Sequence, residues 1–212
     1  MKVTRAAFAQ ILSYHQVHPS YLDFVSVFGR QIEHQELRFS GFRAQKFLDK
    51  VSDSQTQVGR RNAELSNTGE PVPGQTAARF HATPAVSALG RSGRCIQLSW
   101  NLKTVVDNST RGKAEHRDDW SIRQAAFYHQ FDVENGNTLW IATSGGDDIQ
   151  SRVEDHTGRN ARPEDVNFDT PKSSFRSSLS VHQLFCNWST EGWRGHLGWL
   201  EQTIAKRVLL PM

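Results

Sequence analysis

The sequence has few cysteines and no long apolar run, and these absences exclude several classes of protein. Its two cysteines, Cys95 and Cys186, lie far apart, which does not suit the disulfide framework of a small secreted domain. No stretch approaches the roughly 18 consecutive apolar residues of a membrane-spanning helix. The N-terminus also lacks the apolar core and cleavage site of a secretory signal. We therefore expect a soluble, cytoplasmic protein.

A strong excess of one charge and the common catalytic motifs are also missing. The 25 basic and 22 acidic residues leave a net charge of +3, which does not predict a nucleic-acid surface because such a surface needs clustered charge. No GxxxxGK phosphate loop, GxSxG elbow or HExxH zinc motif occurs. His15 with His18, and His182 with Cys186, have the spacing of metal ligands on a helix, but further ligands are not nearby. We expect neither a metal nor a cofactor.

The apolar residues in the first half of the chain predict helices and then a strand. Residues 21–28 follow Pro19 and precede Gly29, an arrangement that favours a short buried helix. Residues 42–48 are interpreted as one or two further helical turns. Residues 96–102 alternate apolar and polar side chains, which is typical of a half-buried strand.

The second half of the chain ends in helices. Residues 175–188 are periodic, and polar segments at about 51–79 and 144–174 are interpreted as long loops. The pattern predicts one α+β domain over residues 1–212, in which N-terminal and C-terminal helices flank an antiparallel sheet with a central hairpin. A last helix, with Thr190 as its N-cap, carries apolar residues at spacings of four, three and four: Trp193, Leu197, Leu200 and Ile204.

The central hairpin, at about 120–143, contains the most patterned stretch of the chain, WSIRQAAFYHQFDVENGNTLWI. The dipeptide Asn135-Gly136 favours a two-residue type I′ turn. Such a turn would place Phe131 opposite Trp140. Neither face of the hairpin is purely apolar, so we expect both faces to be covered, with polar groups held inside.

The candidate catalytic residues are His129, Tyr128 and Asp132. Imidazole titrates near neutral pH, and the other two residues lie close to His129 in sequence. Residues 129 and 132 point to opposite faces of a regular strand, so a direct pair would need a bulge. The alternative is a histidine whose hydrogen bonds are satisfied in the core.

Arg123 shares a strand face with His129 and is the first candidate for ligand binding. An arginine on a central strand needs an acidic partner or an anionic ligand, because burying it unpaired is costly. Aromatic side chains beside Arg194 would suit a planar ligand, although tryptophans more often pack in a core. The candidate ligand-binding residues are Arg123, Trp120, Trp140, Trp193 and Arg194.

Two motifs carry a resemblance to a known family. The pattern WSIRQ-x-x-x-YHQFD-x-x-x-G-x-x-x-WI begins at Trp120, and CNWS-x-x-x-WR-x-x-x-x-x-LE begins at Cys186. Together with YLDFVSVFG from Tyr21, they resemble the soluble N-terminal region of fungal CorA-like transporter-domain proteins, over most of the chain. In that family the second motif continues into a long helix and then membrane-spanning helices. The resemblance therefore implies that the membrane part is absent here and that transport is not the activity of this chain.

The resemblance and the residues leave several functions open. The first is a ligand-binding or regulatory domain, with a small polar or anionic ligand near Arg123 and His129 and no membrane contact. The alternative is a small stand-alone enzyme of fungal specialised metabolism, either a cyclase or isomerase or an aminoacyl-tRNA-dependent transferase, which uses Arg123, Tyr128 and His129 without metal. RNA would then be a partner. A third is an interaction module that uses the last helix as its partner surface.

Overall fold

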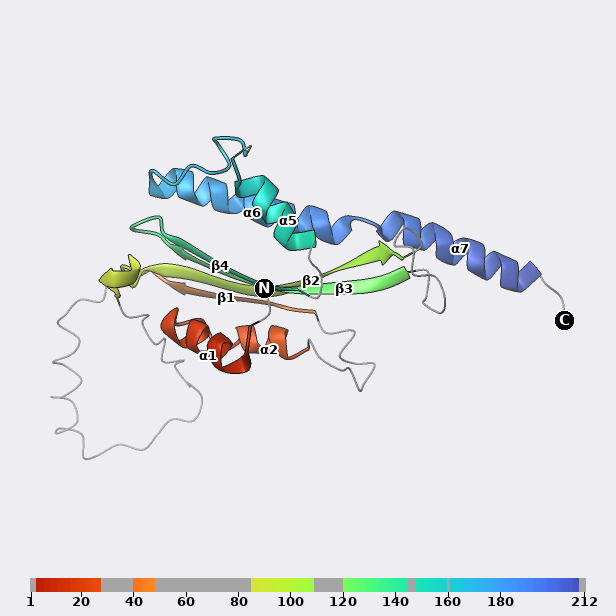
Figure 1. Cartoon of the computed structure of the whole chain (residues 1–212), viewed down its shortest axis with the longest axis horizontal. Coiled ribbons are helices and arrows are strands. Elements are labelled where there is room, and N and C mark those ends of the chain that lie inside the picture. The colour runs from red at the N-terminus through yellow and green to blue at the C-terminus, as the bar shows by residue number, and fades with distance from the viewer. Residues whose placement is uncertain are drawn as a thin grey trace, which may run out of the picture.

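The computed structural model describes residues 3–27, 40–48, 85–108, 120–144, 148–159 and 161–209. Its centre is a four-stranded antiparallel sheet with strand order β1-β2-β3-β4. Helices lie on both faces of this sheet, so the expected α+β architecture, with an antiparallel sheet and helices toward both ends, is confirmed (Figure 1). The strands are β1 (Phe42–Phe47), β2 (Cys95–Asp107), β3 (Trp120–Asp132) and β4 (Thr138–Ser144).

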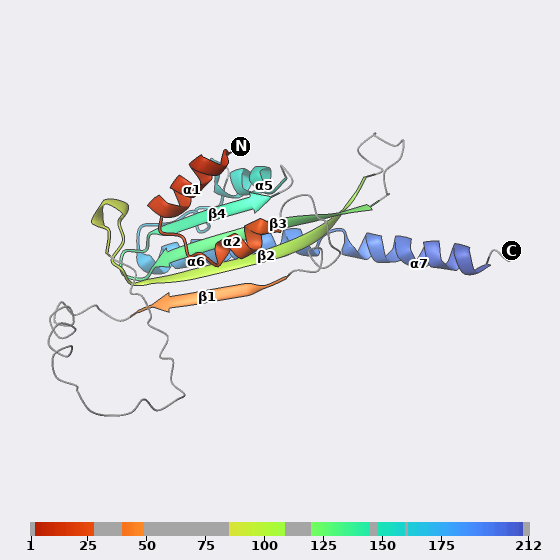
Figure 2. The same cartoon turned by 90° about the horizontal axis from the view of Figure 1, so that it is seen from below.

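The helices form one layer on each face of the sheet, and the last helix extends past the sheet (Figures 1 and 2). The first two helices cover one face of the sheet, the next two cover the other, and the last helix continues beyond the sheet (Figures 1 and 2). Within the described part of the chain, no helix is long and apolar enough to span a bilayer. The helices are α1 (Arg5–Tyr14), α2 (Tyr21–Ser26), α5 (Asp148–Thr157), α6 (Pro171–Thr190) and α7 (Trp193–Leu209).

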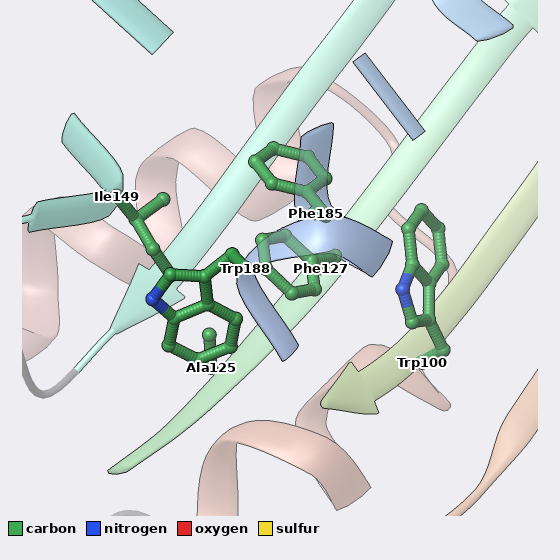
Figure 3. Close-up of a cluster of buried hydrophobic side chains, with 6 residues drawn as sticks. All are labelled: Trp100, Ala125, Phe127, Ile149, Phe185 and Trp188. Atoms are coloured by element: carbon green, nitrogen blue, oxygen red, sulfur yellow. The ribbon is translucent and has the colours of Figure 1, made fainter. Parts of the chain in front are cut away.

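Each face of the sheet buries its own hydrophobic cluster. Under α2, Tyr21 and Phe24 pack against Ala126 and Tyr128 of β3, and the expected helix at 21–28 is confirmed at 21–26. Burying each aromatic side chain stabilises the fold by about 1.5–3 kcal/mol. Figure 3 shows the cluster on the other face, which joins β2, β3, α5 and α6 through Trp100, Ala125, Phe127, Ile149, Phe185 and Trp188.

The two segments before the hairpin differ from the sequence-based expectation. Residues 42–47 are a strand rather than helical turns, because β1 pairs with the free edge of β2, with Phe42 opposite Trp100. The strand at 96–102 was expected to be half-buried, but its polar side chains are buried as well, because α2 covers the second face. Asn101 Oδ1 accepts a hydrogen bond from the Gly41 backbone at 2.9 Å. The buried polar side chains on this face of β2 are Gln97, Ser99 and Asn101.

The hairpin keeps its predicted faces but not its predicted register. His129, rather than Phe131, lies opposite Trp140, and Phe131 lies opposite Thr138. The connection is longer than two residues because the Asp132 carboxylate accepts hydrogen bonds from the backbone N–H groups of Glu134 and Asn135, at 3.1 and 2.8 Å. A shift of two residues leaves every side chain on its expected face.

The C-terminal half contains one helix that was not expected. The segment at about 144–174 was interpreted as a polar loop, but α5 occupies residues 148–157 within it and buries Ile149. Thr190 is the last residue of α6 and not an N-cap, because Glu191 caps the end of α6 and Gly192, at φ +79°, separates the two helices. The expected loop at about 51–79 lies outside the described residues.

Candidate functional site

His129 is held in a buried polar pair beneath α6. Its Nδ1 lies 3.0 Å from His182 Nε2, and its Nε2 lies 2.9 Å from Thr138 Oγ1. Its ring stacks on Trp140, with centroids 4.0 Å apart. Burial, with a smaller contribution from His182, lowers the pKa of His129 to about 3, so the imidazole is neutral at physiological pH. Both ring nitrogens are engaged, which is the arrangement of a histidine satisfied in the core.

The other two candidate catalytic residues lie away from His129. Tyr128 points to the α2 face, where its hydroxyl donates to Gln130 Oε1 at 2.9 Å, and burial raises its pKa. Asp132 also lies on that side and accepts a hydrogen bond from the Ser92 backbone at 2.7 Å in addition to its bonds within the turn. The three side chains therefore do not converge on one reacting atom, and the geometry does not support the enzyme alternative.

Arg123 lies on the α6 face of β3 and is partly buried. Among the residues that the structure describes, no carboxylate lies within 4.0 Å of its guanidinium group. The structure therefore does not identify the acidic partner that the sequence suggested. The hydrogen bonds of the His129 ring go to His182 and Thr138 and not to this guanidinium group.

Three tryptophans meet around His196 where α7 begins. The rings of Trp193, Trp120 and Trp199 lie 6.1, 5.3 and 5.7 Å from the His196 ring, measured between centroids. Trp193 Nε1 donates to the Ser189 carbonyl at 2.8 Å, and the neighbouring Arg194 is exposed. This packing brings together two of the candidate ligand-binding tryptophans. His196, which the sequence reasoning missed, joins them.

A polar groove of about 590 Å³ lies on the outer side of α5 and α6. It is formed by α5, the segment at 161–165 and the side of α6 that faces α5. The sequence does not predict this groove, because the segment that forms one of its walls has the polar composition of a loop. The lining residues include Arg152, Asp155, His156, Arg162, Asp165, Gln183, Leu184, Asn187 and Glu191.

One end of the groove is closed by an ion pair between α5 and the end of α6. Arg152 Nη1 and Nη2 donate to the two carboxylate oxygens of Glu191, at 2.8 and 2.6 Å. The hydrogen bond to Glu191 is the main cause that raises the pKa of Arg152. Asp148 lies 4.0 Å from the same guanidinium and also accepts a hydrogen bond from Trp188 Nε1 at 2.8 Å. Through Asp148, the Arg152–Glu191 ion pair is therefore linked to Trp188 of the buried cluster.

The other end of the groove carries Arg162. No carboxylate of the described segments lies within 4.0 Å of Arg162, whose side chain is exposed. His156 lies nearby on α5, with its Nε2 3.0 Å from Ser180 Oγ. A planar guanidinium fork suits carboxylate and phosphate groups, so this end of the groove can receive an anionic group.

The described residues contain no group of three His, Cys, Asp or Glu side chains that are placed to hold a metal ion. His182, one of the pair with metal-ligand spacing, has its Nε2 at 3.0 Å from His129.

Comparison with known proteins identifies the family of this chain. A family model for CorA-like transporters matches residues 1–67 and 74–209. Neither the curated proteins nor the solved structures gave a match. Because the family model covers well over half of the residues, including both motifs, this chain belongs to the CorA-like family.

Proposed function

We propose that this CorA-like chain is a ligand-binding domain and that the groove between α5 and α6 holds a small polar ligand with an anionic group. The observation that supports this function is the exposed guanidinium of Arg162, which has no carboxylate within 4.0 Å among the described residues and opens into the groove. Arginine is the side chain that best matches a carboxylate or a phosphate.

The remaining lining residues favour a ligand that also carries hydrogen-bond donors. Asp155 and Asp165 contribute acceptors to the groove, whereas Gln183 and Asn187 contribute both donors and acceptors. A simple anion would meet repulsion from the two carboxylates. A ligand with one anionic and one cationic group, such as an amino acid, would satisfy both kinds of side chain.

The hairpin residues have a supporting role in this proposal. His129 has both ring nitrogens engaged, so it holds α6 against the sheet through His182 and does not bind the ligand. Trp140 supports the same pair by stacking on His129. The proposal therefore places the ligand in the groove on the other side of α6 rather than around Arg123 and His129.

The proposal is tested by following the backbone amides of the ¹⁵N-labelled chain by NMR while glutamate or inorganic phosphate is added. Glutamate carries both charges and phosphate only one sign, so we expect glutamate to bind more tightly. The perturbed amides should cluster at the groove residues, and Arg162→Ala should weaken glutamate binding at least tenfold.

A matched control is Arg43→Ala, because Arg43 is an exposed arginine on β1 whose Nη1 donates to the neighbouring Phe42 carbonyl. This variant should bind glutamate as the wild type does. Perturbations scattered over the surface, or equal loss of affinity in both variants, would overturn the proposed site.

A second candidate function is protein–protein interaction through α7. This helix runs beyond the sheet (Figure 2) and exposes a stripe of apolar side chains. Leu197, Ile204 and Val208 are 54%, 60% and 75% exposed. They lie seven and four residues apart, which places them on one side of a helix. An exposed stripe of this kind marks a surface that a partner covers.

A further inference from the structure

Glu191 makes several of the contacts at the junction between α6 and α7. Its backbone N–H donates to the Asn187 carbonyl at 3.2 Å, and its own carbonyl accepts from Thr104 Oγ1 of β2 at 2.9 Å. Its side chain is held by Arg152 of α5. Glu191 is therefore tied to α6, to the sheet and to α5 at the point where the chain turns into α7.

Gly192 makes this junction tight. Its φ of +79° is a left-handed conformation that glycine adopts without strain. A Cβ at this position would overlap the carbonyl oxygen of Val105 in β2. The chain thus passes directly against the sheet, and the direction of α7 is set over the two residues Glu191 and Gly192.

Among the described residues of α7, the side chains at 204–208 are all exposed, so the far end of the helix has few contacts that would hold this direction. Trp120 packs against Gly195 and His196 near the start of the helix. From there α7 runs past the end of the sheet (Figures 1 and 2). A helix of 17 residues is about 25 Å long at 1.5 Å per residue. A small rotation at Glu191 therefore moves its far end by several ångströms.

Arg152 and Glu191 also line the groove. Their side chains are 37% and 52% exposed, so the pair is in contact with water. Exposed ion pairs contribute little to stability and exchange readily with other ions. An anionic group that enters the groove can therefore reach Arg152 and replace the Glu191 carboxylate.

We infer that the Arg152–Glu191 ion pair couples the groove to α7. A second anionic group of a ligand held by Arg162, such as the second carboxylate of glutamate, takes Arg152 from Glu191. The junction is then held by its backbone contacts alone, and α7 can change direction. This inference rests on the proposed ligand site and adds a regulatory role to it. The chemistry is a competition between two carboxylates, or between a carboxylate and a phosphate, for one guanidinium group.

The direction of α7 can be measured by pulsed electron paramagnetic resonance between two nitroxide labels. Cys186 on α6 is exposed, whereas Cys95 is buried. Labelling the Gln202→Cys chain therefore places one label on α6 and one on α7. We expect a narrow distance distribution without ligand, and a distribution at least twice as wide in Arg152→Ala and in Glu191→Gln.

Ligand addition provides the second part of the experiment. Saturating glutamate should widen or shift the distribution of the labelled parent chain, and it should cause no further change in Arg152→Ala. Inorganic phosphate tests whether an anion alone is sufficient. Arg94→Ala is the matched control, because Arg94 forms a surface ion pair with Glu134 at 3.5 Å, at the hairpin turn.

The outcomes separate this inference from the proposed site. If glutamate shifts the amides of the groove but leaves the label distances unchanged, the ligand site stands and the coupling is overturned. If Arg152→Ala and Glu191→Gln keep the narrow distribution, the ion pair does not set the direction of α7, and the inference is again overturned. If glutamate and phosphate do not bind the groove at all, the proposed site and the inference both fail.

Discussion

His182 Nε2 lies 3.0 Å from His129 Nδ1 beneath α6, and both imidazoles are kept neutral by their surroundings. Burial lowers the pKa of His182 to about 4, and burial together with His182 lowers that of His129 to about 3. The groups around the pair are Thr138, which bonds His129, and the indole rings of Trp100 and Trp140. Protonation of the pair is therefore unfavourable in the folded chain, where it joins α6 to β3.

The first prediction concerns stability in acid. Because the unfolded chain binds protons near the ordinary histidine pKa of 6.5, it binds more protons than the folded chain as the pH falls from about 6.5 toward 3. Stability is therefore fully present above this range and is lost as the pH falls through it. Each such histidine contributes a slope of up to about 1.4 kcal/mol per pH unit. Urea unfolding at several pH values measures this slope.

A control for this prediction is His129→Phe, which removes one titrating ring and keeps an aromatic side chain of similar size. Its stability should fall less steeply with acid than that of the wild type. An unchanged slope would mean that His129 titrates alike in the folded and unfolded chains.

A second prediction concerns Asp132, whose carboxylate organises the hairpin turn. Asp132→Ala leaves the backbone N–H groups of Ser92, Glu134 and Asn135 without their acceptor. We expect a loss of about 3 kcal/mol in the free energy of unfolding, measured by chemical denaturation. Glu134→Ala, two residues away and exposed, should cost less than about 1 kcal/mol because it removes only a surface ion pair. Equal losses would contradict the role given to Asp132.

A third prediction compares two glycines, Gly192 just before α7 and Gly198 within it. Gly192→Ala introduces a Cβ against the Val105 carbonyl at a positive φ, so we expect it to cost at least about 1–2 kcal/mol. No atom of the described residues lies within 4 Å of a Cβ added at Gly198, and Gly198→Ala should stabilise the helix by about 0.5–1 kcal/mol. Thermal unfolding of both variants gives the comparison. A stabilising Gly192→Ala would show that the junction does not have the described geometry.

A fourth prediction tests the exposed stripe of α7 as an association surface. If a second copy covers this stripe, the molar mass measured by light scattering should rise with protein concentration. Replacing Leu197 and Ile204 together by lysine should keep the chain monomeric, because it places charge in the apolar contact. Gln202→Lys, at an exposed polar position between them in sequence, is the control and should still associate. A wild type that stays monomeric at all concentrations would exclude self-association through α7.

The faces of the central strand could be predicted from the sequence, whereas its pairing register could not. The alternation of side chains along β3 depends only on the period of a strand, and it placed His129 and Tyr128 on their correct faces. The register depends on the turn, where the Asp132 side chain competes with the Asn-Gly preference for a short loop. Side-chain to backbone bonds of this kind are not visible in a residue pattern.

The groove was missed because one of its walls is a polar helix. In α5 the apolar residues Ile149 and Val153 are four positions apart, which is the only helical signal in an otherwise polar segment. β1 was misassigned for a different reason. Its residues have no strong local preference, and their pairing with β2 comes from a contact about fifty residues away in sequence.

The contact between Gly136 and Pro171 has a consequence for how the chain reaches its native state. A Cβ at Gly136 would lie 2.8 Å from the Cα of Pro171, and the Gly136 carbonyl accepts a hydrogen bond from Ser174 in the first turn of α6. The start of α6 therefore packs against the hairpin turn. We infer that the hairpin forms before α6 packs against it. Mutations in the hairpin turn should then slow folding, whereas mutations in the first turn of α6 should mainly speed unfolding.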